Sequence, residues 1–237
     1  MSEPKVSIII PSYNRFEYLL NAIESVQSQN YKNKEIIVVN DNSSQIEYYN
    51  YDFKDVLKID LDLSFKEKFG FPTDAVRNEG VKLATGKYVA FLDDDDIWLK
   101  NKLTIQVEKM ESTKLKFSST EGYFGEGIFD KNKNYKLYNS EKFYKKIRKR
   151  YKGSKYYKSF KYPSVWNLEF IKIHNCVITS SVMVDKSLFN SIGGFDGLPN
   201  GVGDYDCWLR LLSKTNLAYI DQPLFYYDGA HGSGRNY

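Results

Sequence analysis

Cysteine is scarce in this chain, and the scarcity limits its redox chemistry. The 237 residues include two cysteines, Cys176 and Cys207. They form no CxxC pair and lie far apart, so a disulfide framework is not expected. We expect both to be buried free thiols in a protein of a reducing compartment.

Long apolar runs are also absent. No stretch of 18 apolar residues occurs, so the sequence predicts no membrane-spanning helix. The apolar stretch from Val6 to Pro11 is too short for the hydrophobic part of a secretion signal. We therefore expect a soluble cytoplasmic protein, with peripheral contact to a membrane left open.

Two common nucleotide-binding motifs are missing after the first apolar run. The segment PSYNR contains neither GxGxxG nor GxxxxGK[ST], so dinucleotide binding and P-loop ATP chemistry are not supported. The composition is otherwise that of a globular protein, with 42% hydrophobic and 27% charged residues. The chain is long enough for one substantial core.

Hydrophobic periodicity predicts a strand–helix–strand unit at the N-terminus. Residues 5–10 form a β-branched run that Pro11 ends, and residues 34–40 form a second one. Between them the apolar residues recur at helical spacing from 15 to about 29, with Asn14 as the expected N-cap. Such a unit implies a parallel sheet with a right-handed crossover.

The same alternation continues, and it predicts an α/β fold. Further strands are expected at 56–63, 87–92, 180–184 and 217–220, and further helices at 73–84, 99–111, 186–191 and from 204. Residues 114–163 show no regular pattern. We expect one domain, 1–237, with halves 1–112 and 113–237 and a basic insertion at about 140–162.

Polar groups follow three of the predicted strands. They lie at 11–15, 41–43 and 93–96. Because ligands of parallel α/β sheets bind at the carboxyl ends of the strands, we expect these groups to converge on one site. In the first of them, an aromatic ring, an amide and a guanidinium at a helix start suit a nucleotide or another anion.

Four aspartates, Asp93 to Asp96, directly follow an apolar strand. Such a cluster needs a compensating charge, and hard oxygen donors suit Mg²⁺ or Mn²⁺ holding substrate phosphates. Zinc is disfavoured, since only His174 and His231 are available and neither cysteine is near the cluster. The alternative is a solvated acidic turn or helix start.

A carboxylate opens the last predicted amphipathic helix, in the segment GVGDYDCW. Asp204 follows glycines that permit close approach, so it is a candidate general base. The alternative is a helix N-cap without chemistry.

Residues 142–161 carry ten lysines and arginines interleaved with aromatic residues. We expect a solvated insertion near the acceptor side. Contact with an anionic membrane or an anionic acceptor is the alternative, and nucleic acid is a weaker one.

Five segments of the chain, taken in order, resemble a known family. The segments are VSIIIPSYNR, EIIVVNDNS, AVRNEGVKLATGKYVAFLDDDDIW, VMVDKSLFNSIGGFD and GDYDCWLRL. They resemble the inverting nucleotide-sugar glycosyltransferases of the GT-A fold, family 2, which includes the SpsA-like enzymes. The resemblance covers 5–112 and 177–231. It implies a mixed, mostly parallel sheet flanked by helices, with a smaller acceptor-side region.

The resemblance also implies roles for single residues. The nucleotide-sugar would be bound by Pro11, Tyr13, Arg15, Asp41, Arg77, Asn78, Asp93 and Asp94. Asp95 would bind Mn²⁺ or Mg²⁺, with His231 as a weaker ligand, and Asp96 would begin the next helix. Asp204 would be the catalytic base, with Asp206 as second choice. The family often has Glu-Asp before the last helix, whereas here the pair is Gly203-Asp204.

These assignments predict a metal-dependent glycosyltransferase that moves a sugar, from a UDP-sugar by preference, to a hydroxyl of a glycan, lipid-linked or protein acceptor. One base and one metal, with no second carboxylate nucleophile, imply inversion at the anomeric carbon. The alternatives are a sugar-phosphate nucleotidyltransferase and a basic module that binds nucleic acid or membrane.

Overall fold

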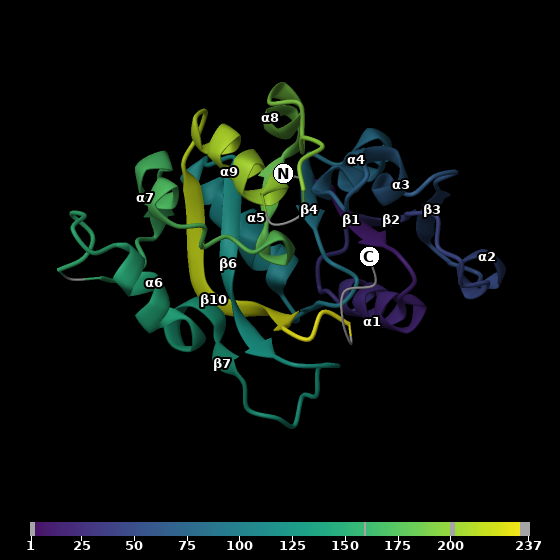
Figure 1. Ribbon diagram of the computed structural model, residues 1–237, viewed down its shortest axis with the longest axis horizontal. Coiled ribbons are helices and arrows are strands. Elements are labelled where there is room, and N and C mark those ends of the chain that lie inside the picture. The colour runs from purple at the N-terminus through teal and green to yellow at the C-terminus, as the bar shows by residue number, and fades with distance from the viewer. Residues whose placement is uncertain (1–2, 159, 200–201, 233–237) are drawn as a thin grey trace.

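A single mixed sheet organises the computed structural model, which describes residues 3–158, 160–199 and 202–232 (Figure 1). Its strand order is β3-β2-β1-β4-β9-β6-β10-β5, with β7 against β6 and β8 against β10. The strands are β1 (Val6–Ser12), β2 (Lys34–Asn40), β3 (Val56–Asp60), β4 (Tyr88–Phe91), β5 (Ile97–Trp98), β6 (Phe117–Gly125), β7 (Lys136–Leu137), β8 (Val165–Trp166), β9 (Met183–Asp185) and β10 (Leu217–Asp228).

Helices cover both faces of this sheet. They are α1 (Phe16–Gln27), α2 (Glu47–Asn50), α3 (Phe65–Phe69), α4 (Arg77–Leu83), α5 (Lys102–Thr113), α6 (Tyr144–Arg150), α7 (Leu168–Ile173), α8 (Lys186–Ser191) and α9 (Gly203–Leu212). Shorter helical turns are η1 (Asp74–Val76), η2 (Tyr138–Lys142) and η3 (Thr179–Ser181). In Figure 1, α6 and α7 lie beyond β10 at one side of the molecule, and α2 and β3 lie at the other.

The parallel part of the sheet follows from the β-branched runs. β1 pairs in parallel with both β2 and β4, and β2 pairs in parallel with β3. This confirms the predicted strand–helix–strand unit and the mixed α/β sheet. Because β1 and β4 are parallel neighbours, their carboxyl ends open onto the same edge of the sheet.

Alternation along the central strands divides the core into two clusters. Ile9, Val39 and Phe91 belong to one cluster, which α4, α8 and α9 complete. Ile8, Val38 and Ala90 belong to the other, which α1 and α5 complete. A strand buried on both faces explains why the runs are apolar throughout rather than alternating.

The second half of the chain is more regular than the sequence pattern predicts. The span 114–163 contains β6, which pairs in parallel with β10 over most of its length. β10 extends to Asp228, well past the predicted end at Ile220. β6 escaped detection because FSSTEGYFG has serine, threonine and glutamate facing the interior, where apolar residues were expected.

One predicted helix cap, one helix start and one strand start are wrong. Asn14 does not cap α1; its backbone has a φ of 52°, and its side chain accepts hydrogen bonds from Ser44 instead. The helix expected from Leu99 begins at Lys102, and the strand expected from Ser180 begins at Met183 after the turn η3. In each case a contact with a distant segment outweighs the local signal.

The basic segment is integrated into the core on one side. Ile147, Tyr151 and Phe160 are almost fully buried and join the first core cluster. The ten lysines and arginines of 142–161 are all exposed. The predicted solvated insertion is therefore correct for the cations and wrong for the apolar residues, which anchor α6.

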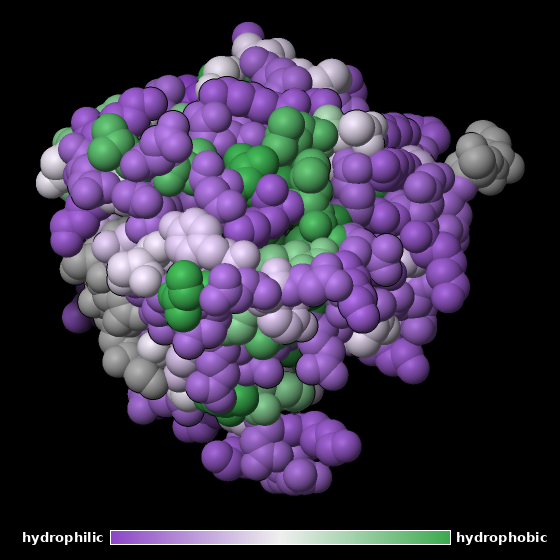
Figure 2. Space-filling view, turned by 90° about the vertical axis from the view of Figure 1, so that its right-hand side faces the viewer, coloured by the Kyte–Doolittle hydropathy of each residue, from purple (hydrophilic) through white to green (hydrophobic). Residues whose placement is uncertain are grey.

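Figure 2 shows the side of the molecule where the edge strand β3 lies in Figure 1. This side is largely hydrophilic, with apolar areas between the polar ones, and Ile46, Leu57 and Leu63 are among the exposed apolar residues. An ion pair between Lys58 and Asp60 lies on β3 itself, where charge discourages pairing with another strand. In the part of the chain that the structure describes, every helix is too short or too polar to cross a bilayer.

The close contact of α4 with the sheet depends on Gly80. A Cβ atom at this position would lie 2.7 Å from Ile9 Cγ2 and 3.0 Å from Val39 Cγ2. We expect Gly80→Ala to lower the free energy of unfolding by about 1–2 kcal/mol, because overpacking outweighs the better helix propensity of alanine. Urea denaturation measures this. Lys82→Ala on the exposed face of α4 is the control, and a G80A midpoint at or above wild type would contradict the prediction.

Candidate active site

A cleft of about 540 Å³ opens where the parallel strands end. Its lining includes most of the residues that the sequence nominated: Pro11, Tyr13, Arg15, Arg77, Asp93, Asp94, Asp95, Asp204 and His231. They come from the ends of β1, β4 and β10 and from the first turns of α4 and α9. Strand-end convergence therefore brings the segments 11–15 and 93–96 together, as the parallel topology predicts. The third polar segment, 41–43, does not line the cleft.

Two arginines compensate the aspartates in this structure. Nη1 of Arg15 lies 3.1 Å from both Asp94 and Asp95. Arg77 pairs with Asp93 and, at 2.7 Å, with Asp74. The compensating charge was expected to be a divalent ion alone, so these guanidinium groups are an addition to that expectation.

The aspartates of the turn have strongly perturbed acidity. Burial, followed by the charges of Asp94 and Asp93, raises the pKa of Asp95 to about 8. Burial also raises the pKa of Asp94, against the opposing effect of Arg15. Asp94 in addition accepts a hydrogen bond of 2.7 Å from the Ser12 hydroxyl. The two arginines thus do not fully offset the cost of burying the turn.

Asp96 does not begin a helix, contrary to expectation. It is completely buried, and its carboxylate accepts a hydrogen bond of 2.9 Å from the backbone N–H of Asp228 at the end of β10. Burial raises its pKa well above the usual value. Asp96 is thus a structural link between the aspartate turn and β10.

Asp228, which sequence analysis missed, shapes the turn that follows β10. Its carboxylate accepts hydrogen bonds from the backbone N–H groups of Gly127, Ala230 and Gly232. This turn delivers His231 to the cleft, where its ring packs edge-on against Tyr227. A DG pair at the end of an aromatic strand was the available signal, since aspartate commonly bonds to nearby backbone in turns.

Asp204 lies in the first turn of α9. Its backbone N–H donates to Asp74, and its carboxylate accepts from the N–H of Tyr205 at 2.5 Å and from the Asn175 amide at 3.5 Å. Burial, followed by the charge of Asp74, raises its pKa to about 6. A carboxylate with this pKa is ionised at neutral pH yet basic enough to accept a proton.

Asp74 is the second residue that sequence analysis missed. It is 7% exposed, lines the cleft and connects Arg77 to the start of α9. Burial raises its pKa, against the effect of Arg77. Its spacing of three residues before Arg77 was a usable signal for an ion pair on a helical turn.

Three nominated residues lie outside the cleft lining. Asp206 pairs with Arg210 at 2.7 Å on the outer side of α9. Asn78 both donates to and accepts from the backbone of Phe195, which fixes the Gly193-Gly194-Phe195 turn. Asp41 is 2% exposed and accepts from the N–H of Phe65 at the start of α3.

The carboxylates of the cleft form an incomplete donor set for a cation. Among the described residues, no group of three or more histidines, cysteines and carboxylates is placed to hold a metal ion. However, the lining contains more carboxylates than guanidinium groups. Mg²⁺ usually takes one or two protein carboxylates and completes its shell with water and phosphate oxygens. The donor set therefore fits a cation that binds together with a diphosphate.

Comparison with known proteins gives a family match over most of the chain. The family profile described as Glycosyl transferase family 2 matches residues 7–166. An uncharacterised glycosyltransferase, RT0329, of Rickettsia typhi is 32% identical over 229 residues, which cover 96% of this chain and 64% of that protein. The Escherichia coli enzyme WfaP, a UDP-Glc:α-D-GlcNAc-diphosphoundecaprenol β-1,3-glucosyltransferase, is 36% identical over 118 residues, covering 50% of this chain and 46% of that one.

Solved structures share the fold. The structure of S. aureus TarS 1–349 has a TM-score of 0.67 and is 17% identical in sequence. The match covers 97% of this chain and 62% of the TarS chain. The mannosyltransferase PcManGT of Pyrobaculum calidifontis, in complex with GDP-Man and Mn²⁺, has a TM-score of 0.64 and is 15% identical in sequence. The match covers 96% of this chain and 57% of PcManGT. The chain thus spans less than two thirds of the length of these proteins.

The buried carboxylate of Asp41 makes stability depend on pH. Burial raises its pKa to about 6, so the folded state binds a proton more readily than the unfolded chain, and this contribution to stability is lost as pH rises from about 4 to about 6. We expect Asp41→Asn to raise the free energy of unfolding by about 2 kcal/mol at pH 8, with little change at pH 4. Thermal denaturation at both pH values measures this, and equal shifts at pH 4 and pH 8 would contradict it.

Proposed function

The chain belongs to glycosyltransferase family 2, and on this basis we propose that it transfers a sugar from a nucleoside-diphosphate sugar to an acceptor hydroxyl with inversion at the anomeric carbon. The observation that carries the proposal is the cleft that joins the aspartate turn after β4 to Asp204 of α9. The family match and the GT-A fold of the structural relatives support a glycosyltransferase over a nucleotidyltransferase. We assign the donor to residues 1–112 and the acceptor to 113–237.

Pro11, Tyr13 and the strand-end groups would bind the nucleotide. The side chain of Asp93 is 28% exposed, against 6% for Asp94, which is occupied with Ser12 and Arg15. The accessible carboxylate of Asp93 is therefore our choice for the ribose hydroxyls. Arg15 and Arg77 lie on either side of the turn, where guanidinium groups can accompany the diphosphate. Direct contact of Asp41 and Asn78 with the donor remains a prediction, because neither residue lines the cleft.

Mn²⁺ or Mg²⁺ would be held by Asp95, with His231 from the turn after β10 as a weaker ligand. When bound, such a cation supplies positive charge to the departing nucleoside diphosphate. The fit rests on the carboxylate excess of the cleft lining. UDP is the favoured nucleotide; a UDP-Glc-dependent relative and a UDP-GlcNAc complex of TarS support it, whereas the GDP-Man complex keeps GDP open.

Asp204 would act as the base. The acceptor oxygen forms a bond to the anomeric carbon as the bond to the diphosphate breaks, and the acceptor proton passes to the Asp204 carboxylate. The Tyr205 N–H and the Asn175 amide hold that carboxylate in place. Asp74 raises the proton affinity of Asp204 through its charge. Because this scheme needs no carboxylate nucleophile, the product has the inverted configuration.

The first test compares two neighbouring carboxylates of α9. We expect Asp204→Asn to lower kcat by about 10²–10⁴-fold, because an amide cannot accept the proton of the acceptor hydroxyl. The KM for the donor should be unchanged. Wild-type kcat should fall about tenfold for each pH unit below about 6, where Asp204 becomes protonated. The assay is Mn²⁺-dependent release of UDP from UDP-sugars, with water or an added acceptor.

Asp206→Asn is the matched control, because Asp206 pairs with Arg210 outside the cleft. It should retain kcat within about threefold of wild type. Loss of activity in D206N with retention in D204N would reverse our choice of base. NMR of the sugar released from a UDP-α-sugar should show the β-anomer before mutarotation, and a first-formed α-anomer would refute inversion.

The second test concerns the donor and the cation. The protein's Tm is measured with each of several nucleoside diphosphates in the presence of Mn²⁺. The nucleotide with the preferred base should raise Tm more than the others, since a ligand that binds only the folded state stabilises it. Asp95→Asn should abolish the Mn²⁺-dependent part of this rise. The exposed Asp62→Asn is the control. An undiminished Mn²⁺-dependent shift in D95N would remove Asp95 from the proposed metal site.

A further inference from the structure

An uncompensated positive surface lies outside the cleft. We call it the basic face and define it as the exposed lysine and arginine side chains of residues 142–161. No aspartate or glutamate occurs from 142 to 168. Within the described residues, the ion pair recorded for this segment is Lys155–Glu169, whose partners are both more than 60% exposed. Such an exposed pair is screened by water and salt, so the charge of the basic face is not neutralised locally.

The basic face has a rigid support. Tyr151 is fully buried, and its hydroxyl donates to the carbonyl of Phe170 on α7 at 3.0 Å. Tyr144 donates in the same way to the carbonyl of Phe160. α6 therefore packs its apolar side into the core and presents its cations to solvent. A backbone that is already ordered in this way loses little freedom when the cations that it carries bind a partner.

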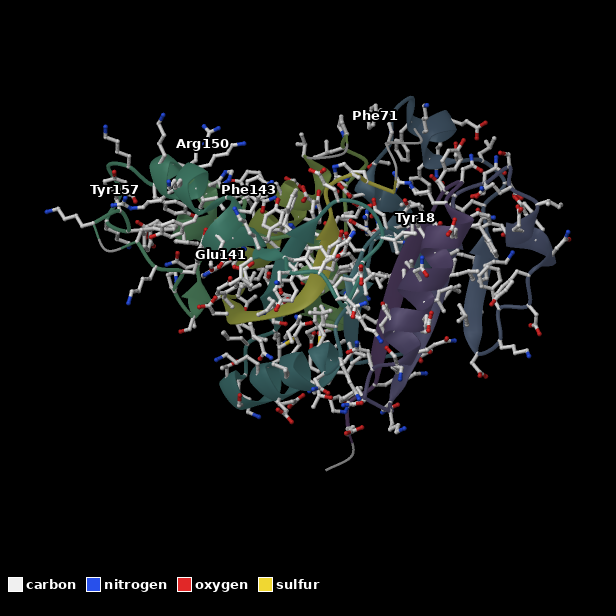
Figure 3. All side chains as sticks on the ribbon, turned by 90° about the horizontal axis from the view of Figure 1, so that it is seen from below. Tyr18, Phe71, Glu141, Phe143, Arg150 and Tyr157 are labelled. Atoms are coloured by element: carbon white, nitrogen blue, oxygen red, sulfur yellow. The ribbon has the colours of Figure 1, made fainter. Side chains whose placement is uncertain are left out.

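The basic face adjoins the base side of the cleft. Tyr151, which follows α6, donates to the Phe170 carbonyl of α7, and the Tyr205 hydroxyl of α9 donates to the carbonyls of Ile171 and Lys172 on the same helix. Asn175, just past the end of α7, contacts Asp204. Figure 3 shows Arg150 and the cleft residue Phe71 at the same edge of the molecule. α6 is therefore connected through α7 to the helix that carries Asp204.

We propose that the basic face docks the chain on the phosphate headgroups of an anionic lipid bilayer. Several adjacent cations on one side of a protein attract such a surface, and each contributes to the affinity. Binding does not depend on the proposed transferase activity. Its consequence does rest on that function: the base side of the cleft faces the membrane, where a lipid-linked acceptor presents its hydroxyl.

Nucleic acid fits the basic face less well. Single-stranded nucleic acids bind through exposed aromatic rings that stack on the bases. Here Tyr151 and Phe160 are buried, and Tyr156 packs against Tyr151 and Phe170. The Tyr157 ring is covered by the guanidinium of Arg148 at 4.9 Å. The aromatic residues of the segment are thus already engaged within the protein.

Co-sedimentation of the 237-residue protein with vesicles tests the proposal. We expect binding to vesicles of equal parts phosphatidylcholine and phosphatidylglycerol, none to phosphatidylcholine alone, and loss of binding in about 0.5 M salt. A fourfold variant should bind the anionic vesicles at least about tenfold more weakly. Its substitutions are Lys145→Gln, Lys146→Gln, Lys149→Gln and Arg150→Gln.

A second fourfold variant removes the same charge from exposed lysines of other elements and should bind like wild type. Its substitutions are Lys32→Gln, Lys54→Gln, Lys66→Gln and Lys116→Gln. Equal binding by the two variants, or equal binding to both vesicle types, would overturn the proposal. So would binding to a DNA oligonucleotide at a matched phosphate concentration without vesicle binding. An unchanged Tm and unchanged release of UDP in solution show that the α6 variant is folded, and they separate this outcome from a failure of the transferase proposal.

Discussion

Four consecutive carboxylates have to be accommodated in one partly buried turn, and the site is arranged around this electrostatic constraint. The structure meets it by giving the aspartates different partners. Asp93 pairs with Arg77, Asp94 and Asp95 share Arg15, and Asp96 turns inward to a backbone N–H of β10. Like charges repel strongly at low dielectric, so the partners must come from different directions. The turn is therefore the point at which several elements are joined.

These partners connect parts of the chain that lie far apart in sequence. Arg15 precedes α1, Arg77 begins α4, and Asp228 ends β10. Removing one partner of a buried ion pair leaves an uncompensated charge, which typically costs about 3–5 kcal/mol. The position of the cleft walls is thus linked to the stability of the fold. Asp74 extends the same network to α9, so Asp204 is held by the charges that also hold the aspartate turn.

Local patterns predicted those features whose cause is local. Continuous apolar runs located β1, β2 and β4, because burial on both faces requires apolar residues at every position. Parallel topology then predicted correctly that the ends of β1 and β4 would meet at one cleft, whereas the end of β2 does not line it. The chemical roles of the cleft residues remain predictions. Features with distant causes were missed. Asn14 bonds to Ser44 rather than to α1, and the buried Glu121 of β6 accepts hydrogen bonds from the N–H groups of Asn139 and Ser140. No single-segment pattern contains these partners.

The modest net charge of the chain conceals a separation of charge that bears on both proposals. The whole sequence carries +4, but ten of its cations lie in residues 142–161, and the remainder has 24 lysines and arginines against 30 carboxylates. The cleft belongs to this acidic remainder, so the anionic donor that we propose would approach it against a repulsive field unless a cation came with it. The basic face attracts phosphate groups without such help. Asp204 lies next to the cleft carboxylate Asp74 and to Asn175. The neighbouring Tyr205 bonds to α7, to which Tyr151 of the basic segment also bonds. Under the two proposals, this separation of charge would let the donor and its cation enter the acidic cleft while the acceptor reaches Asp204 from the side of the basic face.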